Sequence, residues 1–305
     1  MKKYPHDKRA SPRRATETIS GSRAGAAKPP APTDWNHVSQ WYDALVGEQG
    51  SDHHQQVLIP GVLRLVQPRA DMRILDLACG QGVMCRAMAA AGAEVTGVDL
   101  AADLIGTAVQ RSTHPNREKY CVGDARRLEE LSLPAESFDA AVCLLAIANM
   151  TPLSPIWAGC RSLLKPGGQL VIVLLHPCFR IPGKSNWGWD DREAVQYRRI
   201  DGYLTSAKVP IQMHPGTDKS VTTTTFHRPL QAYVNTLGSA GLLLEKMEEW
   251  ISRKQPPAGR RFSALDASRR EIPLFMALSA RKVPFEPHGT GGGGIKKTPA
   301  ADDNI

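Results

Sequence analysis

The sequence predicts an α/β fold in which a mostly parallel sheet is covered by helices on both faces. Two observations indicate it. Apolar runs of strand composition alternate with amphipathic segments through residues 74–176, and the first run ends in two glycines one residue apart. Such alternation implies parallel strands joined by crossover helices. With 305 residues and 42% hydrophobic content, the chain can hold one large or two small domains with a real core.

The expected elements follow one another in a regular order. Two amphipathic helices come first, at 34–47, capped by Asp34, and at 53–67. Strands are then expected at 74–77, 93–100, 117–125, 138–146 and 169–176, and helices around 87–91 and at 101–112 and 154–168. After residue 228 a helix at 229–241 is followed by strands at 242–250 and 272–282, which a basic, Pro-rich loop separates.

Residues 177–228 interrupt this alternation. They contain Trp187, Trp189, several prolines and two strand-like runs, 197–204 and 220–226. Because the segment follows a strand that ends at the ligand-bearing edge of the sheet, it is interpreted as an inserted β-hairpin that forms a lid.

The charge distribution and the cysteines indicate the domain boundaries and the cellular compartment. The net charge is +8, but residues 1–33 alone carry eight Lys or Arg and two acids, so most of the basicity lies there. This segment is interpreted as a disordered leader, with an organellar transit peptide as the alternative, and 284–305 as a flexible tail. The domain is therefore placed at 34–283. Six cysteines without CxxC spacing favour buried thiols in a reducing compartment, the cytoplasm, and no run is long enough to cross a membrane.

The stretch ILDLACGQG, residues 74–82, organises the sequence. A buried strand followed by Gly80 and Gly82 predicts a tight turn into a helix, a place where a ligand meets backbone N–H groups. The dinucleotide fingerprint G-x-G-x-x-G is incomplete, because Cys85 occupies its sixth position. Asp76 points to a cationic ligand, since its carboxylate would repel a pyrophosphate.

The pattern D-x-A-C-G-x-G, residues 76–82, resembles motif I of the class I S-adenosylmethionine-dependent methyltransferases. The segments 41–47 and 50–55 resemble the N-terminal helices that close over the methionine part of the cofactor in the small-molecule members. The resemblance implies a Rossmann-like three-layer sandwich whose seven-stranded sheet is mostly parallel, with an antiparallel last strand beside the fifth. It also implies S-adenosylmethionine as cofactor, S-adenosylhomocysteine as product, and methyl transfer to an oxygen, nitrogen or carbon of a small molecule.

The cofactor site is predicted around the strand ends. Asp99, 17 residues after Gly82, can accept hydrogen bonds from ribose hydroxyls, or else cap the helix that starts near Ala101. By resemblance, Asp124 takes the adenine amine and the N–H of Ala125 a ring nitrogen, although a lone Gly-Asp also suits a turn. The predicted set is Tyr42, Asp76, Ala78, Gly80, Gly82, Asp99, Leu100, Asp124, Ala125 and Leu144; Tyr42 and Leu144 could equally be core residues.

Acceptor-side residues are expected at the strand ends and in the lid. His176 and His227 are candidates for a general base or a substrate-orienting donor, with a structural role as the alternative for each. Asn149 follows the fourth strand, and Trp187, Trp189 and Tyr203 could wall an apolar acceptor, or simply hold the hairpin together. No metal ligand is predicted.

Two signatures of other methyltransferase types are missing from the sequence, which argues against those two reactions. AIANM replaces the Asn-Pro-Pro-aromatic signature of adenine and glutamine methyltransferases, and Pro177-Cys178 follows the fifth strand, not the fourth as in cytosine-C5 RNA methyltransferases. Three alternatives stay open: an RNA methyltransferase using the basic segments, a non-catalytic cofactor-binding protein, and a nicotinamide-dependent dehydrogenase. The expected partner is a small molecule, without nucleic acid or membrane, and the chain is expected to be a monomer or homodimer.

Overall fold

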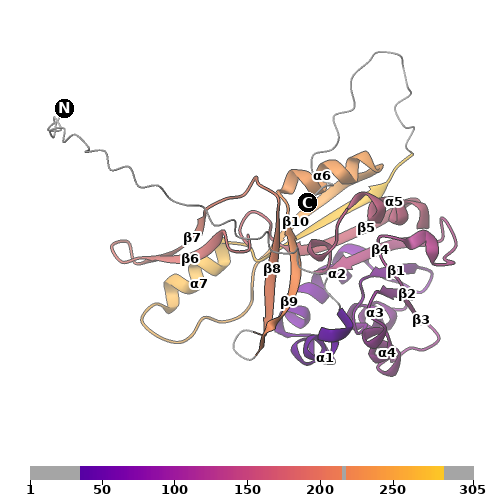
Figure 1. Ribbon diagram of the computed structural model, residues 1–305, viewed down its shortest axis with the longest axis horizontal. Coiled ribbons are helices and arrows are strands. Elements are labelled where there is room, and N and C mark those ends of the chain that lie inside the picture. Colours follow the sequence, from indigo (N-terminus) through magenta and orange to yellow (C-terminus); the bar gives the residue numbers. More distant parts are fainter. Residues whose placement is uncertain (1–34, 215–217, 285–305) are drawn as a thin grey trace, which may run out of the picture. The chain divides into compact units, whose positions relative to one another are not determined.

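A computed structural model of the chain describes residues 35–214 and 218–284 (Figure 1). The predicted cap Asp34, the predicted leader and the predicted tail except Pro284 lie outside this description. Within the described part, no helix is long and apolar enough to span a membrane.

A seven-stranded sheet forms the centre of the domain, in the order β10-β11-β5-β4-β1-β2-β3. All neighbours pair in parallel except β11, which is antiparallel to both β5 and β10. The predicted fold class, with its antiparallel last strand beside the fifth, is therefore confirmed. The strands are β1 (Arg73–Leu77), β2 (Glu94–Asp99), β3 (Glu118–Val122), β4 (Phe138–Leu144), β5 (Leu164–Leu175), β10 (Leu242–Trp250) and β11 (Phe275–Lys282).

Helices cover both faces of the sheet because alternate strand residues face opposite ways. Ile74 packs with α2 and α3 in one apolar cluster, and the next residue, Leu75, packs with α5 and α6 in the other. The helices are α1 (Trp35–Val46), α2 (Ile59–Val66), α3 (Val83–Ala90), α4 (Ala102–Gln110), α5 (Ser154–Leu163), α6 (Leu230–Ser239) and α7 (Phe262–Glu271), with short turns η1 (His54–Leu58), η2 (Leu128–Glu130) and η3 (Ile147–Asn149).

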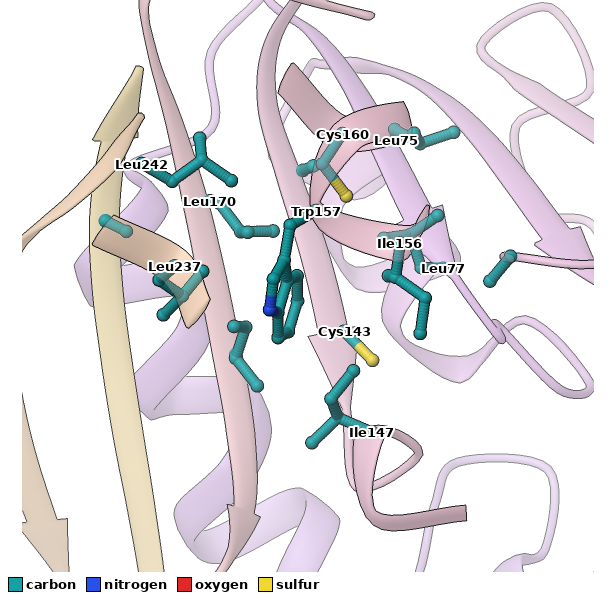
Figure 2. Packing of buried hydrophobic residues seen from close by; sticks show 14 of the residues in the cluster. Leu75, Leu77, Cys143, Ile147, Ile156, Trp157, Cys160, Leu170, Leu237 and Leu242 are labelled. Atoms are coloured by element: carbon teal, nitrogen blue, oxygen red, sulfur yellow. The ribbon is translucent and has the colours of Figure 1, made fainter. Parts of the chain in front are cut away.

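Trp157 lies at the centre of the cluster between the sheet, α5 and α6 (Figure 2). Its side chain is fully buried among Leu170, Leu237 and Cys143, and its indole N–H donates to the Thr236 hydroxyl over 3.0 Å. A large aromatic ring whose only polar atom is hydrogen-bonded gains burial without leaving an unpaired donor. This contact joins α5 to α6 on one face of the sheet.

Two predicted elements differ from the structure. The helix in the segment 154–168 ends at Leu163, before its predicted Pro-Gly-Gly stop, but β5 begins at Leu164 and not at 169, so that Pro166, Gly167 and Gly168 form an irregularity within the strand, where the pairing with β4 shifts register. Proline and glycine disfavour a continued helix, and here the chain passes directly from α5 into β5. The loop expected over 260–270 is largely α7, whose alanines, leucine and i,i+4 pair Asp266–Arg270 favour helix despite the basic charge.

The insertion holds two hairpins, not one. β6 (Ser185–Asp190) pairs with β7 (Val195–Ile200), and β8 (Ala207–His214) pairs with β9 (Asp218–His227). The predicted runs 197–204 and 220–226 each contain a strand, but each pairs with its own sequence neighbour. Short-range pairing costs less loop-closure entropy, so local hairpins are favoured over the pairing of two distant runs.

Trp157→Ala is expected to lower the free energy of unfolding by about 3 to 5 kcal/mol, through lost burial and the cavity that remains. Urea denaturation followed by circular dichroism measures this. Leu243→Ala on β10, where the side chain is 51% exposed, is the control and should change stability by no more than about 0.5 kcal/mol. Equal losses for the two variants would contradict the central role of Trp157.

Candidate functional site

The turn after β1 depends on left-handed backbone at three positions. Ala78, Gly80 and Gly82 have φ values of 53°, 55° and 81°. A Cβ on Gly82 would stand 2.7 Å from the Tyr120 hydroxyl oxygen, and one on Gly80 would stand 3.3 Å from the ring of Tyr42. Both glycines are therefore required by conformation and by close approach, and the turn leaves β1 directly for α3.

Asp99 fixes this turn to the end of the neighbouring strand β2. Its Oδ2 accepts the N–H of Gly80 over 2.8 Å, and its Oδ1 accepts the N–H of Ala101 over 2.9 Å. Burial raises the pKa of this carboxyl, and the backbone donors oppose that rise. Asp99 thus bonds Ala101 before α4, which was one of its two predicted roles, and it also holds the glycine turn. The ribose contact stays a prediction, for which each oxygen keeps a further lone pair.

Asp76, near the end of β1, is a buried carboxylate without a cation. It is 1% exposed, and among the described residues only the Cys85 thiol donates to it, over 3.1 Å. Burial raises its pKa to about 7, and the charge of Asp99 adds to the rise. An acid poised in this way favours a cationic group, because the ligand would restore the charged form.

Asp76 and three residues of the turn, Ala78, Cys79 and Gln81, line one side of a cavity next to α1. The lining brings together four of the predicted cofactor residues, Tyr42, Asp76, Ala78 and Leu144. The remaining lining residues are Val46, His54, Cys79, Gln81, Val83 and Met84. Burial, with smaller contributions from Asp99 and Asp76, raises the pKa of Tyr42 to about 12, so its hydroxyl is neutral at physiological pH.

A polar network holds α1 over the turn. Arg111 at the end of α4 forms a two-pronged ion pair with Asp43 of α1, at 2.5 and 2.8 Å. The same guanidinium donates to Gln81 Oε1, and Gln81 Nε2 donates to the carbonyl of Gly47, where α1 has ended. The helix that carries Tyr42 is therefore tied to the residue between the two glycines.

His54 and Gln81 line the cavity but were not predicted as site residues. His54 is 9% exposed, its Nδ1 lies 2.8 Å from the Ser51 hydroxyl, and burial lowers its pKa. Gln81 could have been chosen from its position inside the glycine turn. For His54 the only signal is the segment GSDHHQ, residues 50–55, whose resemblance to the small-molecule methyltransferases singles out no residue.

Asp124, after β3, is engaged by a neighbour. Arg126 Nε and Nη2 bind its two oxygens at 2.9 and 2.6 Å, and this pairing lowers the pKa of Asp124 although burial opposes it. Ala125 is buried and Leu100 is half exposed, and none of these three lines the cavity. An adenine amine would have to share Asp124 with a guanidinium.

The two candidate histidines differ in what their ring nitrogens do. His176 Nδ1 accepts the N–H of Cys178 over 3.2 Å, so the neutral ring carries its proton on Nε2, which donates to Glu249 over 2.7 Å. Both nitrogens are therefore occupied. His227 Nε2 donates to the carbonyl of Tyr203 over 2.7 Å, whereas Nδ1 has no partner among the described residues.

The other acceptor-side candidates are spread through the insertion. Tyr203 also accepts the N–H of Leu230 on its hydroxyl, which ties β9 and α6 to the loop before β8. Trp187 and Trp189 on β6 contact arginine guanidiniums, and Asn149 ends the half-buried turn η3. The structure does not bring these side chains into the cavity beside Asp76.

Comparison with known proteins places this geometry in a family. Residues 75–172 match a family model described as "Methyltransferase domain". A solved structure of an S-adenosylmethionine-dependent methyltransferase from Mesorhizobium loti aligns with a TM-score of 0.58 and 28% identity over 77% of this chain and 100% of that one. Residues 75–172 therefore form a methyltransferase domain, and the chain is similar to S-adenosylmethionine-dependent methyltransferases.

A curated relative agrees over part of its length. The ubiquinone biosynthesis O-methyltransferase of Xanthomonas axonopodis pv. citri is 34% identical over 144 residues, which are 46% of this chain and 57% of that protein. The chain thus spans little more than half the length of the relative it matches. A protein from Listeria monocytogenes, 21% identical over 74% of this chain and 99% of its own, shares the fold with a TM-score of 0.56.

The residues of the methyltransferase domain fit S-adenosylmethionine on two observations. The buried acid Asp76 has no cationic partner in the described part of the chain, and the cofactor brings an α-ammonium and a sulfonium. A Cβ on Gly80 would meet the ring of Tyr42, which lines the cavity, so the glycine lets the main chain of the turn approach that ring closely. Both features suit a cationic ligand that approaches the main chain closely.

Asp99→Ala is expected to weaken S-adenosylhomocysteine binding by about 1 to 3 kcal/mol, because ribose acceptors are lost and the Gly80 N–H loses its partner. Titration calorimetry measures the dissociation constant. Glu94→Gln, at the opposite end of β2 and exposed, is the matched control and should bind normally. An unchanged dissociation constant for Asp99→Ala would limit that acid to a structural role.

Cofactor binding is expected to strengthen as pH rises toward 7. The free protein must lose the Asp76 proton to pair with a cation, so below its pKa of about 7 the dissociation constant should change by up to about tenfold per pH unit. Calorimetry from pH 5.5 to 8 in buffers of different ionisation enthalpy reports the proton released. Asp76→Asn should bind weakly and with little pH dependence; a variant as pH-dependent as the wild type would show that another group titrates.

Proposed function

We propose that the protein transfers the methyl group of S-adenosylmethionine to a small-molecule acceptor. The observation that carries this proposal is the buried carboxylate of Asp76, which pairs with no cation among the described residues, beside the left-handed glycine turn. A nicotinamide dinucleotide would bring a pyrophosphate to the same turn, where Asp76 and Asp99 would repel it. The match to a methyltransferase domain supports the same conclusion.

The bound cofactor supplies an activated methyl group on a positively charged sulfur. The chain then has to hold the acceptor in line with the carbon–sulfur bond and exclude water. We assign Asp99 to the ribose, Asp76 to the cationic end and Tyr42 on α1 to the cover over the cavity. Asp124 serves the adenine end if its pair with Arg126 shares an oxygen.

An oxygen acceptor is our first choice, because the matched relatives are named O-methyltransferases. A hydroxyl must lose its proton as it attacks, and a neutral imidazole with a free nitrogen can accept it. His227 has such a nitrogen in Nδ1, and its other nitrogen is fixed on the Tyr203 carbonyl. His176 is assigned to loop orientation, since both of its nitrogens are used.

The domain boundaries and setting are part of the proposal. We take residues 34–283 as the catalytic domain and 177–228 as the acceptor-side insertion. The free cysteines of the described chain favour a reducing compartment such as the cytoplasm. An RNA acceptor is the second candidate, because Arg253, Lys254, Arg269 and Arg270 line one basic groove.

Native mass spectrometry of the purified protein and calorimetry with S-adenosylhomocysteine test the proposal directly. We expect retained or added S-adenosylhomocysteine to bind, and a labelled methyl group to appear on members of a panel of small hydroxylated molecules. Binding of NADH without S-adenosylhomocysteine would overturn the proposal. Methyl transfer only to RNA, with the steep salt dependence of phosphate contacts, would favour the second candidate.

A further inference from the structure

Two arginines of the insertion share one tryptophan ring. The guanidinium carbon of Arg180 lies 5.1 Å from the ring centroid of Trp187, and that of Arg198 lies 5.3 Å from the same centroid. Trp187 on β6 stands directly opposite Arg198 on β7, and all three side chains are half-buried. Two like charges, one on β7 and one in the turn after β5, therefore lie against one indole.

Neither guanidinium is neutralised by an acid in the described part of the chain. Arg198 donates to the carbonyls of Phe179 and Ser185 and to the Ser185 hydroxyl, all of them uncharged. The Nε of Arg180 is buried and donates to none of the described residues. Burial lowers the pKa of Arg180 to about 10, and the charge of Arg198 adds to the effect.

Three acids on or next to the same hairpin bind other groups. Asp201 pairs with the neighbouring Arg199 at 2.6 Å, and Asp190 accepts two backbone N–H groups of the β6–β7 turn. Asp191 accepts the indole N–H of Trp189. The lack of a counter-charge at Arg180 and Arg198 is thus a local property of this cluster and does not reflect a shortage of acids.

The arginine cluster lies just beyond the carboxyl end of β5, on the side of the sheet where an acceptor is expected. The backbone N–H of Arg180 donates to the carbonyl of His176 over 2.8 Å, so Arg180 lies one turn beyond the end of β5. Ligands of open α/β sheets bind outside the carboxyl ends of the strands. Guanidinium groups bind carboxylates and phosphates through two parallel hydrogen bonds, and partial burial strengthens those bonds.

We propose that Arg180 and Arg198, held on Trp187, bind a carboxylate or phosphate group of the methyl acceptor. The acceptor is then a small organic acid or a phosphate ester, and its anion supplies the missing counter-charge. This inference rests on the proposed methyltransferase function, since it names the substrate class of the same enzyme.

Anion binding can be measured without turnover. Calorimetry at low salt uses benzoate, phenyl phosphate and the neutral benzamide as probes, with Arg180→Gln as the test variant. Arg199→Gln removes the adjacent, exposed and acid-paired arginine of β7 and is the matched control. We expect the wild type and Arg199→Gln to bind at least one of the two anions and not benzamide, and Arg180→Gln to bind that anion at least tenfold more weakly.

The choice between the probes identifies the acid: preference for benzoate indicates a carboxylate, and preference for phenyl phosphate a phosphate ester. Benzamide binding as tightly as the anions, or equal anion affinity in the two variants, would overturn the proposal. So would failure of both anions to bind the wild type.

A thermal melt separates binding from a structural role. Because Arg180→Gln removes an uncompensated charge, its melting temperature without anion should equal or exceed that of the wild type. Only the wild type and Arg199→Gln should gain stability when the anion is added. A lower melting temperature for Arg180→Gln, with the anion effect retained, would make Arg180 structural. S-adenosylhomocysteine binding, expected unchanged in this variant, is measured separately, so a failure there would count against the methyltransferase function and not against the anion site.

Discussion

The hydrogen bond from the Gly80 N–H to the Asp99 carboxylate links the two strands on which the site depends. It fixes the turn after β1 to the end of β2, so the left-handed residues of the turn have one defined position. That position starts α3 and sets the wall of the cavity. α1 is then held above the turn through Gln81, whose amide joins Gly47 and Arg111. Loss of this one hydrogen bond would therefore loosen both the glycine turn and the attachment of α1 above it.

The same arrangement gathers negative charge where burial makes it costly. Asp76 and Asp99 are both buried and each raises the energy of the other's charged form. The two apolar clusters on either face of the sheet, with Trp157 at the centre of one, supply stability that offsets this cost. Strain and unpaired charge concentrated at one edge, with regular packing elsewhere, are typical of a binding site on a rigid scaffold.

Regular, periodic features of the sequence predicted the fold well, because buried parallel strands and their glycine turn leave an uninterrupted local pattern. Pairings within the insertion could not be predicted in the same way. Polar strands carry little information on pairing register, and the lower entropy cost of short loops favoured pairing between strands that are neighbours in sequence. Among the site residues, the pairing of Asp124 with Arg126 and the free nitrogen of His227 depend on side-chain directions that spacing does not specify. The helical character of 262–271 was hidden by its charge, although its alanines and its Asp266–Arg270 pair favoured helix.

The two halves of the proposed site carry opposite electrostatic character, and the reaction itself makes use of that difference. Buried acids near β1 and β2 suit a cationic donor, whereas the arginines after β5 suit an anionic acceptor. A cationic donor and an anionic acceptor each neutralise charge that is costly in the empty protein. This combination is therefore favoured over an anionic donor with a cationic acceptor. In the proposed reaction, the product cofactor would lack the positive charge on sulfur, so the buried acids would hold it less tightly than S-adenosylmethionine. The proposed anion site of the insertion would then set specificity for the acceptor, and the glycine turn would set release of the product cofactor.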